Sequence, residues 1–171
     1  MAVRDIQAWN IKLLDIVNNP ISGKGIATEV ELPEISREFD QDIRAGESGV
    51  INRPKYFKEM ESTIKFMSMS EEFFKAVAEN VAKPITVSLT ASAADTTTGF
   101  TVPYSVNMRG YYGTLPLGSF SEDGMEGEIT LMVNYISLNF GSNTLVVDPA
   151  NYIYAVNGVN MFESIKAELG I

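Results

Sequence analysis

The chain has 171 residues, of which 45% are hydrophobic and 20% charged, and its formal net charge is −9 at pH 7. This composition is typical of a single globular domain, and the negative balance argues against nucleic-acid binding through clustered Lys and Arg. Cys and His are both absent, which excludes disulfides, Cys/His zinc sites and catalytic triads with an imidazole base.

Alternating strand patterns dominate the first third of the chain. Residues 10–17 form a short apolar run that ends at a turn cluster, residues 18–20. Apolar and polar residues alternate over 26–32 and, after a proline, again over 35–43, which predicts two half-buried strands. A further alternating stretch over 59–66 predicts a strand with these residues on one side: Met60, Ser62, Ile64 and Phe66.

A helix is predicted after this strand. Ser68 and Glu71 have the spacing of a capping box, which satisfies two free amides at a helix start. Pro84 is predicted to end the helix. The expected apolar stripe, at spacings i, i+3, i+4 and i+7, consists of Phe74, Val77, Ala78 and Val81.

The second half predicts a hairpin and one long strand. Residues 84–92 and 100–108 are the arms of the hairpin, and "ADTTTG" is its turn. The second arm is expected to share one face among Phe100, Val102, Tyr104, Val106 and Met108. The long strand covers 129–140, where the alternation shifts by one residue near Tyr135 and predicts a β-bulge or a strand buried on both faces.

Two short strands, 144–148 and 152–158, precede a last helix. Asn160 and Glu163 are expected to cap this helix and Gly170 to end it. Its inward residues are predicted to be Phe162, Ile165 and Leu169. We therefore predict a single, mainly β domain over 1–171, a β-sandwich or barrel with one packed α-helix and a short C-terminal helix.

None of the motifs that could indicate catalysis matches the pattern of a catalytic site. "SGKG" (22–25) lacks the first Gly and the Ser or Thr of a phosphate loop, so a turn is the better interpretation. The pairs Glu29/Glu31 and Glu126/Glu128 fit a solvated strand face better than glycosidase carboxylates. We expect no catalytic, metal-binding or cofactor-binding residue, no cofactor, and a protein that is not an enzyme.

The most unusual stretch is a long excursion, "EFDQDIRAGESGVINRP" (38–54). Residues 29–47 hold seven acids and two bases, and 122–128 hold four acids and no base. Three apolar residues lie in the loop context of the excursion: Ile43, Val50 and Ile51. They either pack back onto their own domain or contact another subunit.

In the order of its elements the chain resembles the major tail tube proteins of contractile-tailed bacteriophages, also found in phage-like bacteriocins. The resemblance covers essentially the whole chain. It is carried by "NIKLLDIVNNPISGKG", Leu32-Pro33, "REFDQDIRAGESG", "YSVNMRGYY", the acidic glycine loop and "NGVNMFESIKAELGI".

The resemblance implies hexameric rings whose inner strands close into one continuous barrel, and which stack into a tube inside a contractile sheath. The excursion, at about 40–58, would then be an inter-ring stacking loop. Its contact residues would be Ile43, Arg44, Gly46, Glu47, Gly49, Val50, Ile51 and Arg53. If Phe39 faces the core, the opposite side of its strand faces the lumen, with Ser36, Glu38, Asp40 and Asp42.

The implied partners are other copies of the chain, a sheath protein, a tape-measure protein in the lumen during assembly, and baseplate and tail-terminator proteins. DNA would pass through without specific binding, and no membrane is involved. Charged residues at 4, 5, 12 and 15 interrupt the first stretch, so we expect no signal peptide. The implied location is the virion tail, with assembly in the cytoplasm of the bacterial host.

Three alternatives remain open from the sequence. One is a secretion-system or bacteriocin tube protein of the same fold. The others are a monomeric β-sandwich module that binds a sugar or peptide, and a carboxylate-based hydrolase. Rings or tubes in negative-stain images would support the tube proteins, and isolated particles would support the other two.

Overall fold

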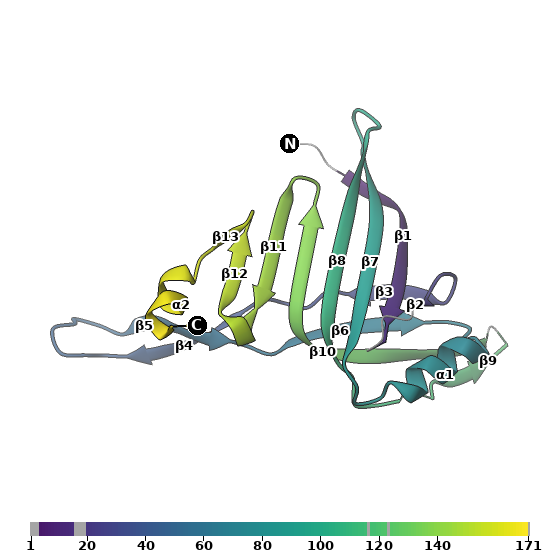
Figure 1. Ribbon diagram of the computed structural model, residues 1–171, viewed down its shortest axis with the longest axis horizontal. Coiled ribbons are helices and arrows are strands. Elements are labelled where there is room, and N and C mark those ends of the chain that lie inside the picture. Colours follow the sequence, from purple (N-terminus) through teal and green to yellow (C-terminus); the bar gives the residue numbers. More distant parts are fainter. Residues whose placement is uncertain (1–3, 16–19, 116, 123, 171) are drawn as a thin grey trace.

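The computed structural model describes residues 4–15, 20–115, 117–122 and 124–170. In this part of the chain, eleven strands form one antiparallel sheet, and two more form a separate hairpin (Figure 1). The predicted mainly β fold is therefore confirmed. Residues 16–19 of the predicted strand end and turn, and Asp123 of the acidic loop, lie outside the described residues.

The first seven strands are β1 (Arg4–Leu14), β2 (Pro20–Ser22), β3 (Ala27–Glu31), β4 (Arg37–Asp42), β5 (Ile51–Phe57), β6 (Met60–Phe66) and β7 (Ile85–Asp95). The others are β8 (Thr101–Tyr111), β9 (Ser119–Ser121), β10 (Gly124–Phe140), β11 (Asn143–Asp148), β12 (Ile153–Val156) and β13 (Val159–Asn160). The helices are α1 (Glu71–Glu79), the short 3-10 helix η1 (Pro149–Asn151) and α2 (Glu163–Leu169).

Strand β10 joins the two layers of the fold. Its residues 127–133 pair with β6, and its residues 132–140 pair with β8. The register with β8 shifts between Val133 and Tyr135, which confirms the bulge predicted from the shift in alternation. In Figure 1, β10 runs lengthwise beside β6 and then turns upward between β8 and β11. The two layers are thus parts of one bent sheet, and the described residues of a single chain do not close a barrel.

The hydrophobic core lies between these layers. The predicted inward side of β6 is fully buried, and the Ser62 hydroxyl donates to the Glu31 carbonyl at 2.8 Å, so its polar group is satisfied. The residues of β10 on both sides of the bulge are buried as well: Ile129, Leu131, Val133, Ile136 and Leu138. They pack with buried residues of β1, β7 and β8 in one cluster.

Helix α1 begins and ends at other residues than predicted. Ser70, not Ser68, caps it by accepting a hydrogen bond from the Phe73 amide, and the helix ends at Glu79, before Pro84. Phe73, and not Phe74, joins Val77 in the core. Adjacent residues of a helix point about 100° apart, so with Phe73 inward Phe74 points toward the edge of the buried face. The buried Tyr112 hydroxyl donates to the Val77 carbonyl at 2.7 Å and ties α1 to the sheet. Burial raises the pKa of Tyr112 to about 12.

Two other predicted faces are only partly buried. The β7–β8 hairpin is confirmed, and Val106 and Met108 are buried, but Phe100 is 76% exposed because the hairpin extends beyond the core. At the N-terminal cap of α2, Phe162 packs on the rings of Phe57 and Tyr154. Ile165 and Leu169, predicted to face inward, are exposed in the single chain.

The C-terminal turn and cap largely follow the prediction. Asn160 accepts from the Phe162 amide at 3.1 Å and donates to Glu163, although Phe162 itself occupies the cap position of α2. Gly170 ends the helix in the left-handed conformation, with φ 69. The sequence "SGKG" forms a turn before β3, as predicted.

Gly110 lies in β8 opposite Val133, at the bend of β10. A Cβ atom at this position would lie 1.9 Å from the Met132 carbonyl oxygen, so the backbones could not keep their present spacing. We expect Gly110→Ala to lower the free energy of unfolding by about 1–3 kcal/mol, as overpacking does. Urea denaturation measures this change.

Gly113→Ala is the matched control, since a Cβ atom there meets nothing within 4 Å. It should change the free energy of unfolding by less than about 0.5 kcal/mol. Equal effects of the two substitutions would show that the close spacing of β8 and β10 does not depend on Gly110.

Candidate functional site

The excursion is a β-hairpin and not an irregular loop. β4 pairs with β5 in antiparallel register, with Asp42 opposite Ile51, and residues 43–50 form its tip. The two-stranded ladder satisfies the backbone of a segment that has no core to pack on. Figure 1 shows that the hairpin projects past the main sheet along the long axis of the molecule.

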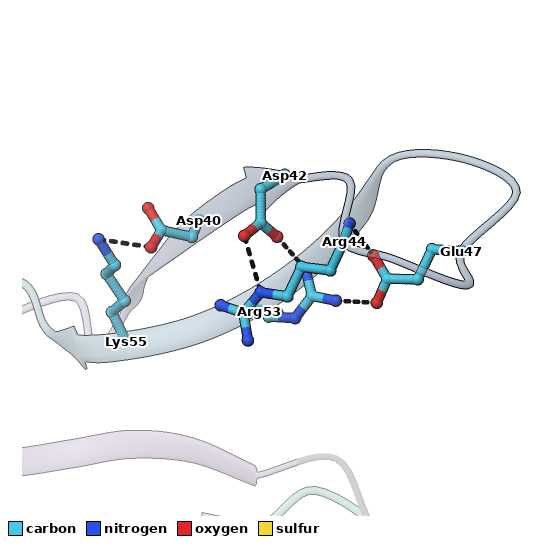
Figure 2. Close-up of polar contacts among 6 residues, drawn as sticks. All are labelled: Asp40, Asp42, Arg44, Glu47, Arg53 and Lys55. Atoms are coloured by element: carbon cyan, nitrogen blue, oxygen red, sulfur yellow. Dashed lines mark hydrogen bonds and ion pairs between the residues drawn. The ribbon is translucent and has the colours of Figure 1, made fainter.

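Ion pairs run along both strands of the hairpin (Figure 2). Lys55 pairs with Asp40 at 2.6 Å. Asp42 binds both Arg44, at 2.9 Å, and Arg53, which also binds Glu47. The Glu47 carboxylate accepts a hydrogen bond from the Arg44 amide at 2.8 Å, which fixes the turn at the tip.

The hairpin is therefore electrically neutral. Residues 37–57 contain four acids and four bases, and Glu38 pairs with Lys58 just beyond β5 at 3.3 Å. The range 29–47, in which acids outnumber bases, stops before Arg53 and Lys55 of β5. For that reason the sequence overstated the negative charge of the hairpin. The negative charge of the chain lies elsewhere.

The pairing changes two pKa values. The hydrogen bond from Arg44, together with the charges of Arg44 and Arg53, lowers the pKa of Asp42 below 3.8. The hydrogen bond to Asp40 raises the pKa of Lys55 above 10.5. Both groups therefore stay charged across the neutral range, and the hairpin keeps its ion pairs there.

Aromatic stacking fixes the base of the hairpin to the body. The guanidinium of Arg37 lies 5.6 Å from the centre of the Phe57 ring and 5.3 Å from that of Phe162, and it donates to the Lys55 carbonyl. Phe57 stacks on Tyr154 with ring centres 5.7 Å apart. These cation–π and ring contacts couple the direction of the hairpin to α2 and β12.

The tip exposes apolar side chains to water. Ile43 is 62% exposed, Val50 60% and Ile51 44%. The tip therefore does not pack back onto its own domain, which was one of the two alternatives from the sequence. Gly46, at φ 87, allows the left-handed turn between Arg44 and Glu47.

The premise of the lumen prediction for β4 is wrong. Phe39 is 53% exposed and does not face the core, because the hairpin has left the core at this point. Glu38, Asp40 and Asp42 are half-buried by their ion pairs with bases. They do not present an unpaired acidic strip in the single chain.

An acidic face that strand alternation alone does not predict lies on another part of the sheet. β3, β6 and β10 present their polar sides together, opposite the core, and one lysine, Lys65, lies among the acids. Lys65 binds Glu29 at 2.9 Å and lies opposite Glu128 in the ladder. Its pKa is raised by the hydrogen bond to Glu29 and by the charges of Glu29, Glu128 and Glu31. Alternation in the sequence predicts the polar side of each strand. Only the pairing register shows that the polar sides of the three strands lie on one face.

One apolar groove has a single carboxylate, Glu29, in its lining. It is a groove of about 290 Å³ between the layers, lined mainly by apolar residues that include Ile6, Trp9, Val30, Leu89 and Phe140. Within the described ranges, no three acidic side chains are grouped closely enough to hold a metal ion. No helix in the part of the chain that the structure describes is long and apolar enough to cross a membrane.

Comparison with known proteins decides the family. The sequence model of the family described as phage tail tube protein FII matches residues 9–170. The chain belongs to this family. It is also 24% identical over 169 residues to a tail tube protein of Escherichia phage P2, and the alignment covers 94% of this chain and 96% of that protein.

Membership confirms the resemblance drawn from the order of elements. The chain is a structural protein of the phage tail tube and a component of the virion tail. A tube is built by self-assembly, so the functional surfaces of a tail tube protein are those that contact further copies. The projecting hairpin, whose apolar tip is exposed to water, is a candidate for such a surface.

The ion pairs of the tail tube protein's hairpin predict a local effect of Asp42→Asn. Removing this carboxylate leaves Arg44 and Arg53 without their shared partner. The amides of Arg44 and Glu47 should therefore exchange hydrogen several-fold faster at neutral pH. Since Asp42 is at the surface, the urea midpoint should not change. In the wild-type chain, whose Asp42 pKa lies below 3.8, the protection of these two amides from exchange should persist at neutral pH.

Asp40→Asn is the matched control, because it removes the pair with Lys55 and leaves the tip network complete. It should not change exchange at Arg44 and Glu47. Unchanged exchange in Asp42→Asn would contradict the role of the network in ordering the tip.

Proposed function

We propose that this tail tube protein forms hexameric rings that stack into the inner tube of a contractile tail, and that the tube conducts DNA during ejection. The observation that carries the proposal is the hairpin, which projects along the long axis with an exposed apolar tip (Figure 1). Exposed apolar residues at the end of a rigid projection suit a contact with another copy. A head-to-tail contact of this kind generates an open filament.

Ring closure in this proposal uses the sheet. Among the residues that the structure describes, β3 pairs with β6 alone, so its other edge is open to a neighbouring copy. A closed barrel of several copies leaves no open edge. The layer of β3, β6 and the first part of β10 would then be the inner wall, with its acidic face toward the channel.

An acidic wall suits the passage of DNA. Carboxylates gain no contact with phosphates and release no counterions, so DNA would pass without binding to the wall. Glu29, Glu31, Glu61 and Glu128 would supply this charge. The lumen role of Ser36, Glu38, Asp40 and Asp42 stays a prediction, and the face around Lys65 is a more strongly charged candidate.

The remaining partners follow from a place in a contractile tail. We propose contacts with a sheath protein, a tape-measure protein, baseplate and tail-terminator proteins, and assembly in the host cytoplasm. We propose no enzymatic activity. Membership of the tail tube family favours this function over a secretion-system tube, a monomeric binding module or a hydrolase.

Replacing residues 43–50 by Asn-Gly tests the stacking role of the tip. Asp42 and Ile51 are opposite each other in the ladder, so a two-residue turn can join them without strain. We expect a variant with the circular dichroism spectrum and urea midpoint of the wild type that forms rings but no long tubes. Negative-stain images of the purified proteins, with a baseplate nucleus if required, give the result.

The matched control shortens the other long hairpin by replacing residues 96–99 with Asn-Gly between Asp95 and Phe100. This variant should still form long tubes. Normal tubes from the variant without the tip would show that stacking depends on another surface, and isolated particles from the wild-type chain under all conditions would contradict the proposed function itself.

A further inference from the structure

The end of the molecule opposite the hairpin tip carries a second exposed apolar surface. In Figure 1, α1 and β9 lie at one end of the long axis and the β4–β5 tip at the other. A shallow hollow of about 560 Å³ lies between α1, β9 and the start of β10. It is lined by Met69, Ser70, Glu71, Phe74, Leu117, Phe120 and Met125.

The hollow is too apolar to be an ordinary solvated surface. Phe120 is 86% exposed and Leu117 62%, and both lie beside the flexible side chains of two methionines. Methionine adapts to the shape of a partner and is common on binding surfaces. Clustered exposed apolar residues of this kind mark a protein interface.

We propose that this hollow receives the hairpin tip of a copy in the adjacent ring. The inference rests on the proposed function and names the surface that completes its stacking contact. Ile43 and Val50 would insert among Phe120, Leu117 and Met125. One chain then supplies both halves of the contact at opposite ends of its long axis, which is the condition for a head-to-tail filament.

Charge at the rim agrees with this pairing. The side chain of Arg44 on the tip is 63% exposed even with Asp42 bound. Glu71 lies at the rim of the hollow and is exposed, in the first turn of α1. A tip seated in the hollow brings this arginine toward this carboxylate, and their attraction sets the orientation of the contact more than its strength.

Cross-linking tests the proposal cleanly, because the chain has no native cysteine. Val50→Cys and Phe120→Cys are combined in one chain, tubes are assembled, and a short bismaleimide is added. Each link would join one ring to the next, so we expect a ladder of covalent products that continues beyond the hexamer on a denaturing gel. Each single variant should give dimers at most.

Val50→Cys with Phe100→Cys is the matched control. Phe100 is also strongly exposed but lies at the turn of the β7–β8 hairpin, away from the hollow, so no ladder is expected. Normal tubes without a ladder from Val50→Cys/Phe120→Cys and from Ile43→Cys/Leu117→Cys would overturn the proposal and leave the tube function intact. Links that stop at the hexamer would place the contact within a ring and overturn it too.

Hydroxyl-radical footprinting of the wild-type protein tests the same proposal without any substitution, so it applies even if the cysteine variants fail to assemble. Hydroxyl radicals oxidise exposed methionine and phenylalanine, so the peptides with Phe120 and Met125 should be oxidised several-fold less in tubes than in the unassembled protein. Equal oxidation in the two states would overturn the proposal. Absence of tubes from the wild-type chain would instead contradict the proposed function.

Discussion

The β4–β5 ladder holds an apolar tip in water, away from the core of the chain that carries it. A segment in this position has no burial to stabilise it, so its backbone bonds, the pairs of Arg53 and Lys55 with acids, and the stacking of Arg37 on Phe57 and Phe162 must fix its shape. A tip that is already ordered loses less conformational entropy when it binds. Neutral, rigid and apolar at its end, the hairpin suits repeated contact between identical copies.

The charges of the chain are divided unequally between the hairpin and the main sheet. The hairpin has no net charge, whereas the polar side of β3, β6 and β10 carries several glutamates around Lys65. The surfaces proposed to pack on a copy are thus neutral or apolar, and the face proposed to line a channel repels phosphate. The bend of β10 at Val133–Tyr135 makes this possible, because the one strand pairs with β6 in the layer of the acidic face and then with β8 in the other layer.

Sequence alone predicted the parts whose pattern is set within one strand. The inward side of β6 and the bulge near Tyr135 follow directly from alternation, because burial imposes a period of two. The hairpin was missed because its two strands are joined by Arg53 and Lys55, which lie far along the chain from Asp42 and Asp40, the acids that they bind. The exposure of Phe100, Ile165 and Leu169 was missed because a pattern shows which side of an element is apolar, not where the element leaves the core.

In the proposed tube, the hairpin of one tail tube protein crosses into the adjacent ring while the acidic face lines the channel. A reconstruction of assembled tubes by electron cryomicroscopy tests both parts in one measurement. The account predicts density for residues 43–50 against α1 and β9 of a subunit in the next ring, with Glu29 and Glu128 on the channel wall. A hairpin that lies on its own ring, or an acidic face turned toward the outside of the tube, would contradict it.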